Sequence, residues 1–511
     1  MYVVGISTIF ASNSDHNMGS SNTEIKLISL LKTFSEEECR LFRKFAASPY
    51  FNEGRNLLPV IDAALKFHPR FDKPGLTKEF FFSRIYPGEK YNQTAFEKQL
   101  SRAAALAGKF LMQRGAESDT DHMLAAQAKE LSRRNLNDMF ENKIKEAEKL
   151  IAKNSPYDVH YFETIRNLEV IKTDNLLANR DSYRSGEKFF ARGDYNLLDM
   201  ITKFILSIED IVLVSYELNM DSGRSLAVKA FDFIDIGAIV QMLKDSGNKY
   251  SGLLELRNLE LTALMKPGRD SYIAYRNAVN ENLKDMEWSA KFNTFVIMAS
   301  ICIISREHDA KFYNDELYTL NRIKVDENSY AFREELHTYL PLYISLLSSF
   351  IGRQDTAYID KLADKFGSRI DPKYRESFIS YTHMCRSFME NKFDRALEFH
   401  SGISYDHNLI RINAKLMLVQ IYYELRHTEE LLSLVDSTRK YFAALNNYSK
   451  VKRDSVLRFL KAVKKLAMVR SAGTGITPDE EAKLIPDKDI HFKIWLKEKL
   501  NELGKTKSFT L

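Results

Sequence analysis

The sequence predicts an all-α protein made of helix–turn–helix pairs, with a smaller turn-rich helical unit at the N-terminus. Glycine accounts for only 20 of the 511 residues and proline for 11, against average usage of about 7% and 5%. This shortage argues against sandwiches, barrels and propellers, which need a turn every ten residues or so. From about residue 121 to 470, apolar residues recur three and four positions apart, which is the period of an amphipathic helix. A hydrophobic content of 44% excludes a disordered chain.

The N-terminal unit is expected to span residues 23–118, because five of the eleven prolines fall within 49–87. The S-x-x-E sequence at 35–38 is typical of a capping box, and the helix that follows must end before Pro49. Thr77 is expected to cap a second, short helix. A third helix follows, and its inward-facing residues are expected to be Phe96, Leu100, Ala103, Ala104, Phe110 and Leu111.

From residue 119 onward the pattern is nearly continuous helix. Helices are expected over 121–153, 157–180, 195–220, 233–245, 252–265, 270–286, 288–308 and 310–324. Three pairs follow, 333–351 with 355–366, 373–391 with 393–401, and 406–425 with 428–445, and then a helix over 451–470. The first helices of these pairs start 40 and 33 residues apart, a spacing typical of stacked helix–turn–helix repeats.

These patterns predict a division of the chain into regions. After the N-terminal unit we expect a long-helix region over 119–330, repeats over 331–470, and a linker with a C-terminal helix over 471–511. Residues 1–22 are expected to be disordered or a mis-assigned start, with Met18 as the alternative first residue.

One turn between paired helices carries a recognisable sequence. In NKFDRAL (391–397), the aromatic Phe393 stands three positions before the small residue Ala396. This arrangement resembles the turn of tetratricopeptide repeats, in which the small residue lets the paired helices approach. GDYNLL (193–198) has a similar form with a leucine at the small position, and 424–437 keeps the spacing without glycine or alanine. The resemblance implies a degenerate tetratricopeptide-like array in which Phe393 and Ala396 are buried between paired helices.

A second resemblance lies in the N-terminal unit. FSEEECRLFRKFAASPYFN (34–52) is followed by LTKEFFFSRIYPGEKYN (76–92). This pair of motifs is similar to one in a group of uncharacterised bacterial all-helical proteins with repeat-like C-terminal halves. The resemblance implies a shared fold and transfers no activity.

The sequence lacks the motifs of common enzyme and metal sites. It contains no G-x-x-x-x-G-K-[ST], no H-E-x-x-H and no C-x-x-C, and its three widely spaced cysteines fit a reduced compartment. His400 and His407 are read as solvated or capping residues, with a metal pair as the alternative. One of Asp232 and Asp235 is expected to cap the helix that begins near Ile236, and an acid/base pair is the alternative. We predict no enzyme activity, no cofactor and no metal; an active site assembled from distant side chains is the competing hypothesis.

The net charge of +5 is unevenly distributed. Residues 438–511 hold 17 Lys and Arg against 8 Asp and Glu, and segment 450–470 alone holds eight basic residues and one acidic residue. Such a density can hold phosphates or an acidic partner. The candidate electrostatic partner surface consists of Arg453, Arg458, Lys461, Lys464 and Lys465, opposite an apolar face. The competing interpretation is the polar outer face of a capping helix.

A second candidate surface is the segment 76–114, which holds seven Lys and Arg against three Asp and Glu. A short helix, a Tyr-Pro-Gly loop and a longer helix containing Ser101 and Arg102 resemble the DNA-binding region of some bacterial activators that also carry helical repeats. The phenylalanines at 80–82 favour the alternative, a module that packs against the repeats.

Taken together, these patterns predict a cytoplasmic, non-catalytic helical-repeat scaffold that binds a protein or peptide partner and has no membrane span. The longest apolar stretch, 295–304, is about half the length of a spanning helix and is expected to be a buried helix. The alternative function is a nucleic-acid-binding regulator that uses 76–114 or the basic helix 450–470. The sequence does not specify the oligomeric state.

Overall fold

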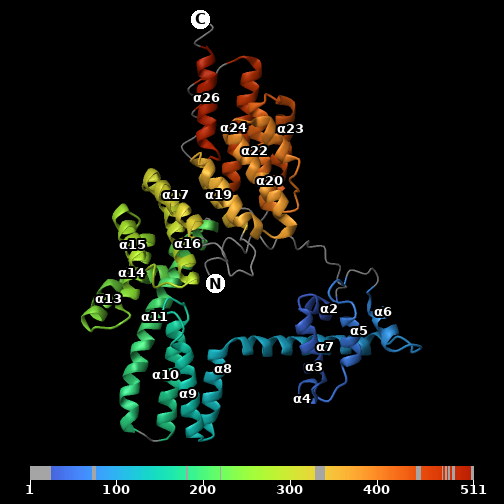
Figure 1. Ribbon diagram of the computed structural model, residues 1–511, viewed down its shortest axis with the longest axis vertical. Coiled ribbons are helices and arrows are strands. Elements are labelled where there is room, and N and C mark those ends of the chain that lie inside the picture. Colours follow the sequence, from blue (N-terminus) through green and yellow to red (C-terminus); the bar gives the residue numbers. More distant parts are fainter. Residues whose placement is uncertain are drawn as a thin grey trace. The chain divides into compact units, whose positions relative to one another are not determined.

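A computed structural model describes residues 25–71, 76–179, 182–218, 220–327, 340–444, 450–474 and 490–507, with a few residues between 476 and 485. These residues form 24 α-helices, four short 3-10 helices and no strand (Figure 1). The predicted all-α class is therefore confirmed. The described residues divide into an N-terminal unit, 25–154 together with 160–197, and a C-terminal unit, 155–159 together with 198 onward.

The N-terminal unit begins with α2 (Lys26–Leu31), α3 (Glu36–Ala47), α4 (Pro49–Asn52), α5 (Leu58–Leu65), α6 (Lys78–Ile85) and α7 (Gln93–Ser118). The predicted capping box is present at the start of α3. The Ser35 hydroxyl accepts a hydrogen bond from the Glu38 N–H at 3.1 Å, and the Glu38 carboxylate accepts one from the Ser35 N–H at 2.7 Å. Thr77 caps α6 as expected. Because α7 turns Phe96, Leu100, Ala103, Leu106, Ala107 and Phe110 inward, it joins the phenylalanine-rich core of these helices.

The helix expected over 121–153 is two helices, α8 (Thr120–Arg133) and α9 (Asn137–Ile151). The break falls at Asn135, whose backbone is left-handed with φ of 58°. Asparagine tolerates this conformation better than most residues other than glycine. Together with α10 (Tyr161–Ala178), these helices enclose a small apolar core that includes Phe140 and Leu168.

The next helix, α11 (Ser182–Leu218), runs for 37 residues and contributes to both units. The helix expected over 195–220 therefore begins earlier than predicted. The segment 193–198 lies inside α11, so its interpretation as a tetratricopeptide-like turn is wrong. The single glycine that suggested a turn is accommodated within the helix, where it costs only about 1 kcal/mol relative to alanine.

The C-terminal unit continues through α12 (Leu226–Ala230), α13 (Ile236–Asp245), α14 (Ser251–Met265), α15 (Arg269–Asn282), α16 (Trp288–Ile304) and α17 (Ala310–Asp326), with short 3-10 helices at 222–224, 231–233 and 305–307. Sequential contacts pair α13 with α14, α14 with α15, and α16 with α17. The core of this region is lined by tyrosines and by the apolar residues of α16, including Tyr272, Tyr275, Phe295 and Ile301.

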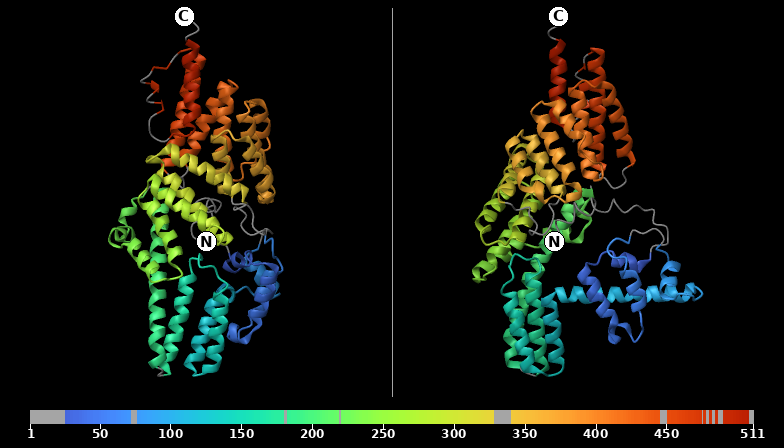
Figure 2. Two further views of the ribbon diagram at one scale, coloured as in Figure 1. Left: turned by 60° about the vertical axis from the view of Figure 1, so that its left-hand side comes forward. Right: turned by 45° about the vertical axis from the view of Figure 1, so that its right-hand side comes forward.

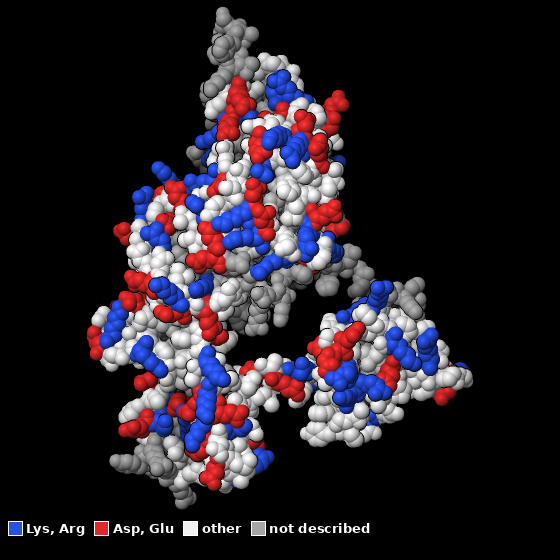
Figure 3. Space-filling view, viewed as in Figure 1, with Lys and Arg blue, Asp and Glu red and all other residues white. Residues whose placement is uncertain are grey.

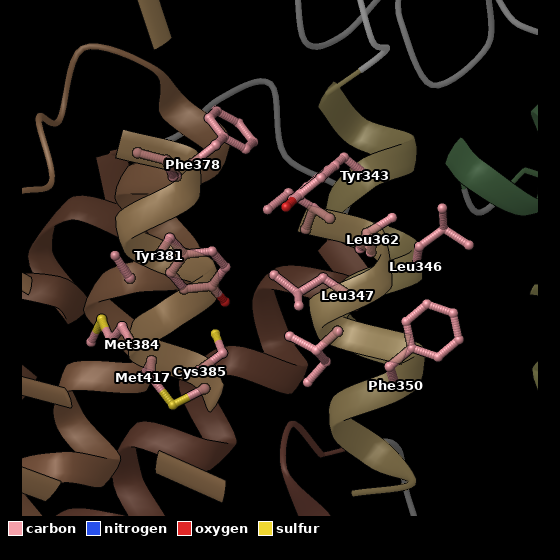
Figure 4. Close-up of a cluster of buried hydrophobic side chains, with 14 of the residues drawn as sticks. Tyr343, Leu346, Leu347, Phe350, Leu362, Phe378, Tyr381, Met384, Cys385 and Met417 are labelled. Carbon is pink, nitrogen blue, oxygen red and sulfur yellow. The ribbon is translucent and has the colours of Figure 1, made fainter. Parts of the chain in front are cut away.

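Three helix pairs follow, α18 (Leu340–Gly352) with α19 (Thr356–Phe366), α20 (Pro372–Met389) with α21 (Phe393–His400), and α22 (Asn408–Glu424) with α23 (Thr428–Ala444). The part of the expected first helix before Leu340 lies outside the described residues. One continuous core runs through the pairs, and Figure 4 shows Tyr343 and Leu347 of α18 beside Tyr381 of α20. Ala396 is fully buried there as predicted, whereas Phe393 is only half-buried and packs against Phe388.

The first helix of the third pair, α22, has two buried faces. Ile410, Ala414 and Ile421 belong to the core shared with α18–α21. Leu416 and Val419 belong to a second core, shared with α23, α24 (Lys450–Ala472) and α26 (Lys493–Lys507). These helices lie alongside one another (Figure 2), and no residue of α22 is fully exposed.

The same tight turn connects the two helices of each pair. The second residue after each first helix (Gln354, Asn391 or Arg426) is left-handed, with φ between 55° and 62°. The N–H of the following residue reaches back to a carbonyl in the last helical turn, at 2.9 to 3.0 Å, which is the Schellman pattern that satisfies helix-terminal carbonyls. Successive turns stand 37 and 35 residues apart. Because non-glycine residues fill these left-handed positions, the pairs form despite the low glycine content.

Replacing the buried small residue of the second pair tests its packing. Ala396→Trp should overpack the contact between α21 and α20 and destabilise the protein by about 1–3 kcal/mol, measured by thermal and urea unfolding. Glu398→Trp on the exposed side of α21 is the control and should have little effect. Equal melting temperatures for Ala396→Trp and the wild type would show that this contact is not packed as described.

The left-handed turn predicts opposite effects for the same substitution at two nearby sites. Arg426→Gly should stabilise the protein by about 0.5–1 kcal/mol, because glycine adopts φ of 62° without a Cβ penalty. Glu429→Gly, inside α23, should destabilise it by up to about 1 kcal/mol. Calorimetry of both variants checks the signs, and a destabilising Arg426→Gly would contradict the turn geometry.

Candidate functional site

The basic helix α24 carries the predicted electrostatic surface. Its apolar face, including Val456, Phe459, Leu460, Val463 and Leu466, is buried. This face packs against α22 and α23 as expected, and α26 packs on the same core. The basic residues occupy the remaining surface of the helix, where Lys461 is exposed and Arg453, Arg458, Lys464 and Lys465 are half-buried.

Several of these basic side chains already have partners within the chain. The Lys464 ammonium lies 2.9 Å from the Asp436 carboxylate on α23, and the Lys465 ammonium lies 3.3 Å from the Glu480 carboxylate. The guanidinium of Arg470, at the end of the helix, lies 3.8 Å from the centre of the Tyr423 ring and donates to the Tyr423 carbonyl. Arg453 and Arg458 also interact with neighbouring groups. The charge that α24 presents to a ligand is therefore smaller than the sequence suggests, and Figure 3 shows basic and acidic side chains interspersed on the face in view.

Basic side chains of the segment 76–114 also have partners within the chain. Lys78 pairs with Glu97 at 2.6 Å, and Lys109 pairs with Glu53 at 2.9 Å. The Arg84 guanidinium lies 5.2 Å from the centre of the Phe80 ring. The side chains of Phe81 and Phe82 are buried in the core of the N-terminal unit itself, and packing of this unit against the repeats stays a prediction.

The outward face of α7 differs from the rest of this segment. Lys98 and Arg102 are exposed one helical turn apart, and neither has an acidic partner among the described residues. Small residues, including Ser101, Ala105 and Gly108, lie exposed along the same helix. This face belongs to the N-terminal unit and α24 belongs to the C-terminal unit, so each surface is considered within its own unit.

Four charged or polar side chains gather in the core beside α11 and were not found by sequence reasoning. The Arg257 guanidinium donates to the Glu260 carboxylate at 3.1 and 3.2 Å, and Tyr275 donates to the same carboxylate at 2.9 Å. The Glu209 side chain is buried beside them, and neither of its oxygens has a hydrogen-bond partner among the described residues. Burial raises the pKa of the Glu209 carboxyl well above its usual range, and the nearby Glu260 carboxylate adds to the shift. A protonated Glu209 is the form this core favours.

Two further buried titratable side chains, Lys324 and Cys302, lie between α16 and α17. Burial lowers the pKa of Lys324 to about 7 and raises the pKa of the neighbouring Cys302 to about 11. Both side chains are enclosed in the core, with 2% and 0% of their surface exposed. We therefore assign neither of them to a ligand site.

The residues that the sequence offered for metal or acid/base chemistry have structural roles. Asp235 caps α13 by accepting a hydrogen bond from the Ala238 N–H at 2.9 Å, which confirms the capping interpretation. His407 caps α22, and His400 forms a hydrogen bond with the Tyr405 hydroxyl. Among the described residues, no group of three or more His, Cys, Asp or Glu side chains could hold a metal ion.

One described segment, Trp288–Glu307, is long and apolar enough to cross a membrane by length and composition alone. It comprises α16 and the following 3-10 helix. Phe295, Met298 and Ile301 of this segment are buried in the core with α15 and α17, an arrangement also found in core helices of proteins outside membranes.

No protein-family model, curated protein or solved structure matches the chain. The resemblances of the motifs at 34–52, 76–92 and 391–397 therefore rest on those residues alone, and they assign no activity.

Lys461 is the fully exposed residue among the five candidate basic residues of α24, so a substitution there tests this surface. Lys461→Glu should leave the melting temperature unchanged, because an exposed charge contributes little to stability. It should also weaken any salt-sensitive retention on heparin. The double change Lys464→Glu with Lys465→Glu should lower the melting temperature slightly, because it places like charges beside Asp436 and Glu480. A large loss of stability from Lys461→Glu would show that this lysine is structural.

The buried Glu209 predicts a pH-dependent effect on stability. The pKa of the Glu209 carboxyl is higher in the folded state than in the unfolded state. The wild type therefore has its full stability at pH values below the unfolded-state pKa, and part of that stability is lost as the pH rises through the folded-state pKa. This loss amounts to at most about 1.4 kcal/mol per pH unit. Glu209→Gln removes it, so the melting temperature of the variant should exceed that of the wild type near pH 8 and match it near pH 5. Glu281→Gln, exposed on α15, is the control, and an equal gain at both pH values would contradict the account.

Proposed function

We propose that the protein is a non-catalytic helical-repeat scaffold that binds a protein or peptide partner on the surface of its C-terminal helix pairs. The observation that carries this proposal is the repeated turn at Gln354, Asn391 and Arg426, which joins the two helices within each of three successive pairs with one geometry. Helix pairs of this kind depend on their neighbours for a core and keep their outer faces for ligands. Groove or face recognition by aromatic and basic side chains would then provide the binding.

A surface suited to such binding extends over α17, α18 and α19. The Arg322 guanidinium lies 4.6 Å from the centre of the Tyr358 ring and 5.9 Å from that of Tyr318. The Arg353 guanidinium lies 5.3 Å from the Tyr318 ring on the same surface. Tyrosine and arginine dominate the energetics of many protein interfaces because they offer large contact areas and hydrogen bonds. Stacking also restrains these side chains before binding, which lowers the entropy lost when a partner docks.

Cross-linking mass spectrometry on the full chain tests the scaffold function. A protein partner captured from cells should cross-link to residues of α17–α19, and Arg322→Ala with Tyr358→Ala should abolish those cross-links without unfolding the protein. Arg306→Ala, an exposed arginine on the same unit, is the control and should retain them. Cross-links that map elsewhere and persist in the double variant would contradict this surface.

The second candidate function is nucleic-acid binding through α7. It is favoured by one observation, the exposed Lys98 and Arg102 beside small residues that let a helix approach a groove closely. Two of the five candidate side chains of α24 are paired with carboxylates. Lys98 and Arg102 have no acidic partner among the described residues, so this part of α7 is the surface we choose for phosphates.

A gel-shift assay at two salt concentrations separates the two functions. Phosphate contacts lose affinity steeply with salt, so nucleic-acid binding through α7 should weaken strongly at the higher salt and disappear in Lys98→Glu with Arg102→Glu. If the wild type shifts no nucleic acid at low salt, this candidate is wrong and the scaffold function is unaffected.

A further inference from the structure

One side of α22 is only partly covered by its neighbours. Asn408, Arg411, Lys415 and Tyr422 follow one another at intervals of three, four and seven residues, so they share a face of the helix. All four are half-buried, whereas residues 416–421 are buried. The helix that carries residues of both C-terminal cores thus has a partly open polar stripe, bordered by Tyr405 before the helix and by α23 after it.

Arg411 and Lys415 place two positive charges one turn apart on this stripe. Like charges at this spacing repel each other, and burial and Arg411 both lower the pKa of the Lys415 ammonium. Neither cation has a carboxylate partner among the described residues; Arg411 donates instead to the Tyr405 carbonyl, at 2.9 Å from Nε. An unmatched pair of this kind costs stability, which suggests that a ligand supplies the missing negative charge.

Three other half-buried cations of the chain pair with carboxylates. Lys499 lies 2.9 Å from the Glu424 carboxylate, and Lys172 lies 2.6 Å from that of Glu169. Arg257 is paired with Glu260 in the core. Arg411 and Lys415 differ from these three cations in having no carboxylate partner among the described residues.

Aromatic rings form the sides of the stripe. The Lys415 ammonium lies 5.8 Å from the centre of the Tyr405 ring and 5.4 Å from that of Tyr441 on α23. The Arg411 guanidinium lies 6.0 Å from the Tyr441 ring. These contacts hold both cations in place and restrict water around them, which strengthens their attraction for an anion.

We propose that Arg411 and Lys415 form a binding site for a phosphate group on the open stripe of α22. Two fixed cations match a phosphate monoester, which carries a charge of about −1.5 to −2 at neutral pH, better than they match a single carboxylate. The guanidinium and ammonium supply charge-assisted hydrogen bonds to its oxygens, and the tyrosine rings contact the group that bears it. This site does not depend on the scaffold function, because it involves neither the α17–α19 surface nor α7.

Calorimetric titration of the full chain tests the site with three probes, inorganic phosphate, a short phosphoserine peptide and the same peptide without phosphate. Wild-type protein should bind the phosphate-bearing probes with salt-sensitive affinity, and Lys415→Met should weaken that binding at least about tenfold. The methionine keeps the length of the side chain, and the melting temperature reports whether the variant is folded. Lys415→Arg should retain binding, as should the control Lys440→Met, an exposed lysine on α23.

The results distinguish the source of the phosphate. A phosphopeptide that binds much more tightly than inorganic phosphate identifies a phosphorylated protein as the ligand, and equal affinities identify a free phosphate or small phosphate ester; both support the site. The proposal is overturned if neither phosphate probe binds the wild type, if the unphosphorylated peptide binds equally well, or if folded Lys415→Met and Arg411→Met bind as the wild type does.

Discussion

The C-terminal unit depends on the packing of α22 between two hydrophobic cores. Ile410, Ala414 and Ile421 face the core of the preceding pairs, while Leu416 and Val419 face the core that includes α24 and α26. A helix buried on opposite sides must be apolar nearly all round, which explains why α22 has no fully exposed residue. Because α22 contributes buried residues to both cores, neither set of neighbours can shift without disturbing the other.

Much of this architecture follows from local sequence signals. The capping box at Ser35 and Glu38, the cap at Thr77 and the apolar face of α24 each depend on a few residues close together in the chain, so their spacing predicts them. The break at Asn135 and the continuity of α11 through 193–198 were not predicted correctly. Asn135 and Gly193 are both exposed, so each outcome depends on local conformational preferences of about 1 kcal/mol, which the hydrophobic pattern does not resolve.

The candidate surfaces were predictable only in part. Sequence reasoning located the basic residues of α24, but it could not show that Lys464 faces Asp436 or that Lys465 faces Glu480, because those carboxylates come from other segments. It gave no weight to Arg411 and Lys415, since two cations among 74 carry no signal until the fold shows which cations have acidic partners. Net charge along the chain is thus a poor guide to function here, and the pairing of each charge is a better one.

The distribution of polar groups separates structural from functional roles. Glu209, Glu260 and Arg257 are enclosed in the core and act on stability. The tyrosine and arginine side chains of α17–α19 and the stripe of α22 are partly open and are already restrained by stacking. Such restrained, partly open groups lose less entropy when a ligand binds than freely moving side chains do.

Hydrogen exchange of a variant of α22 tests most directly whether one helix couples both cores. Leu416→Ala removes side-chain packing from the second core only and should cost about 2–5 kcal/mol. If α22 couples the cores as described, peptides from α20 should lose protection together with peptides from α24, because the two regions open as one unit. Loss of protection in α24 with α20 unchanged would contradict the account.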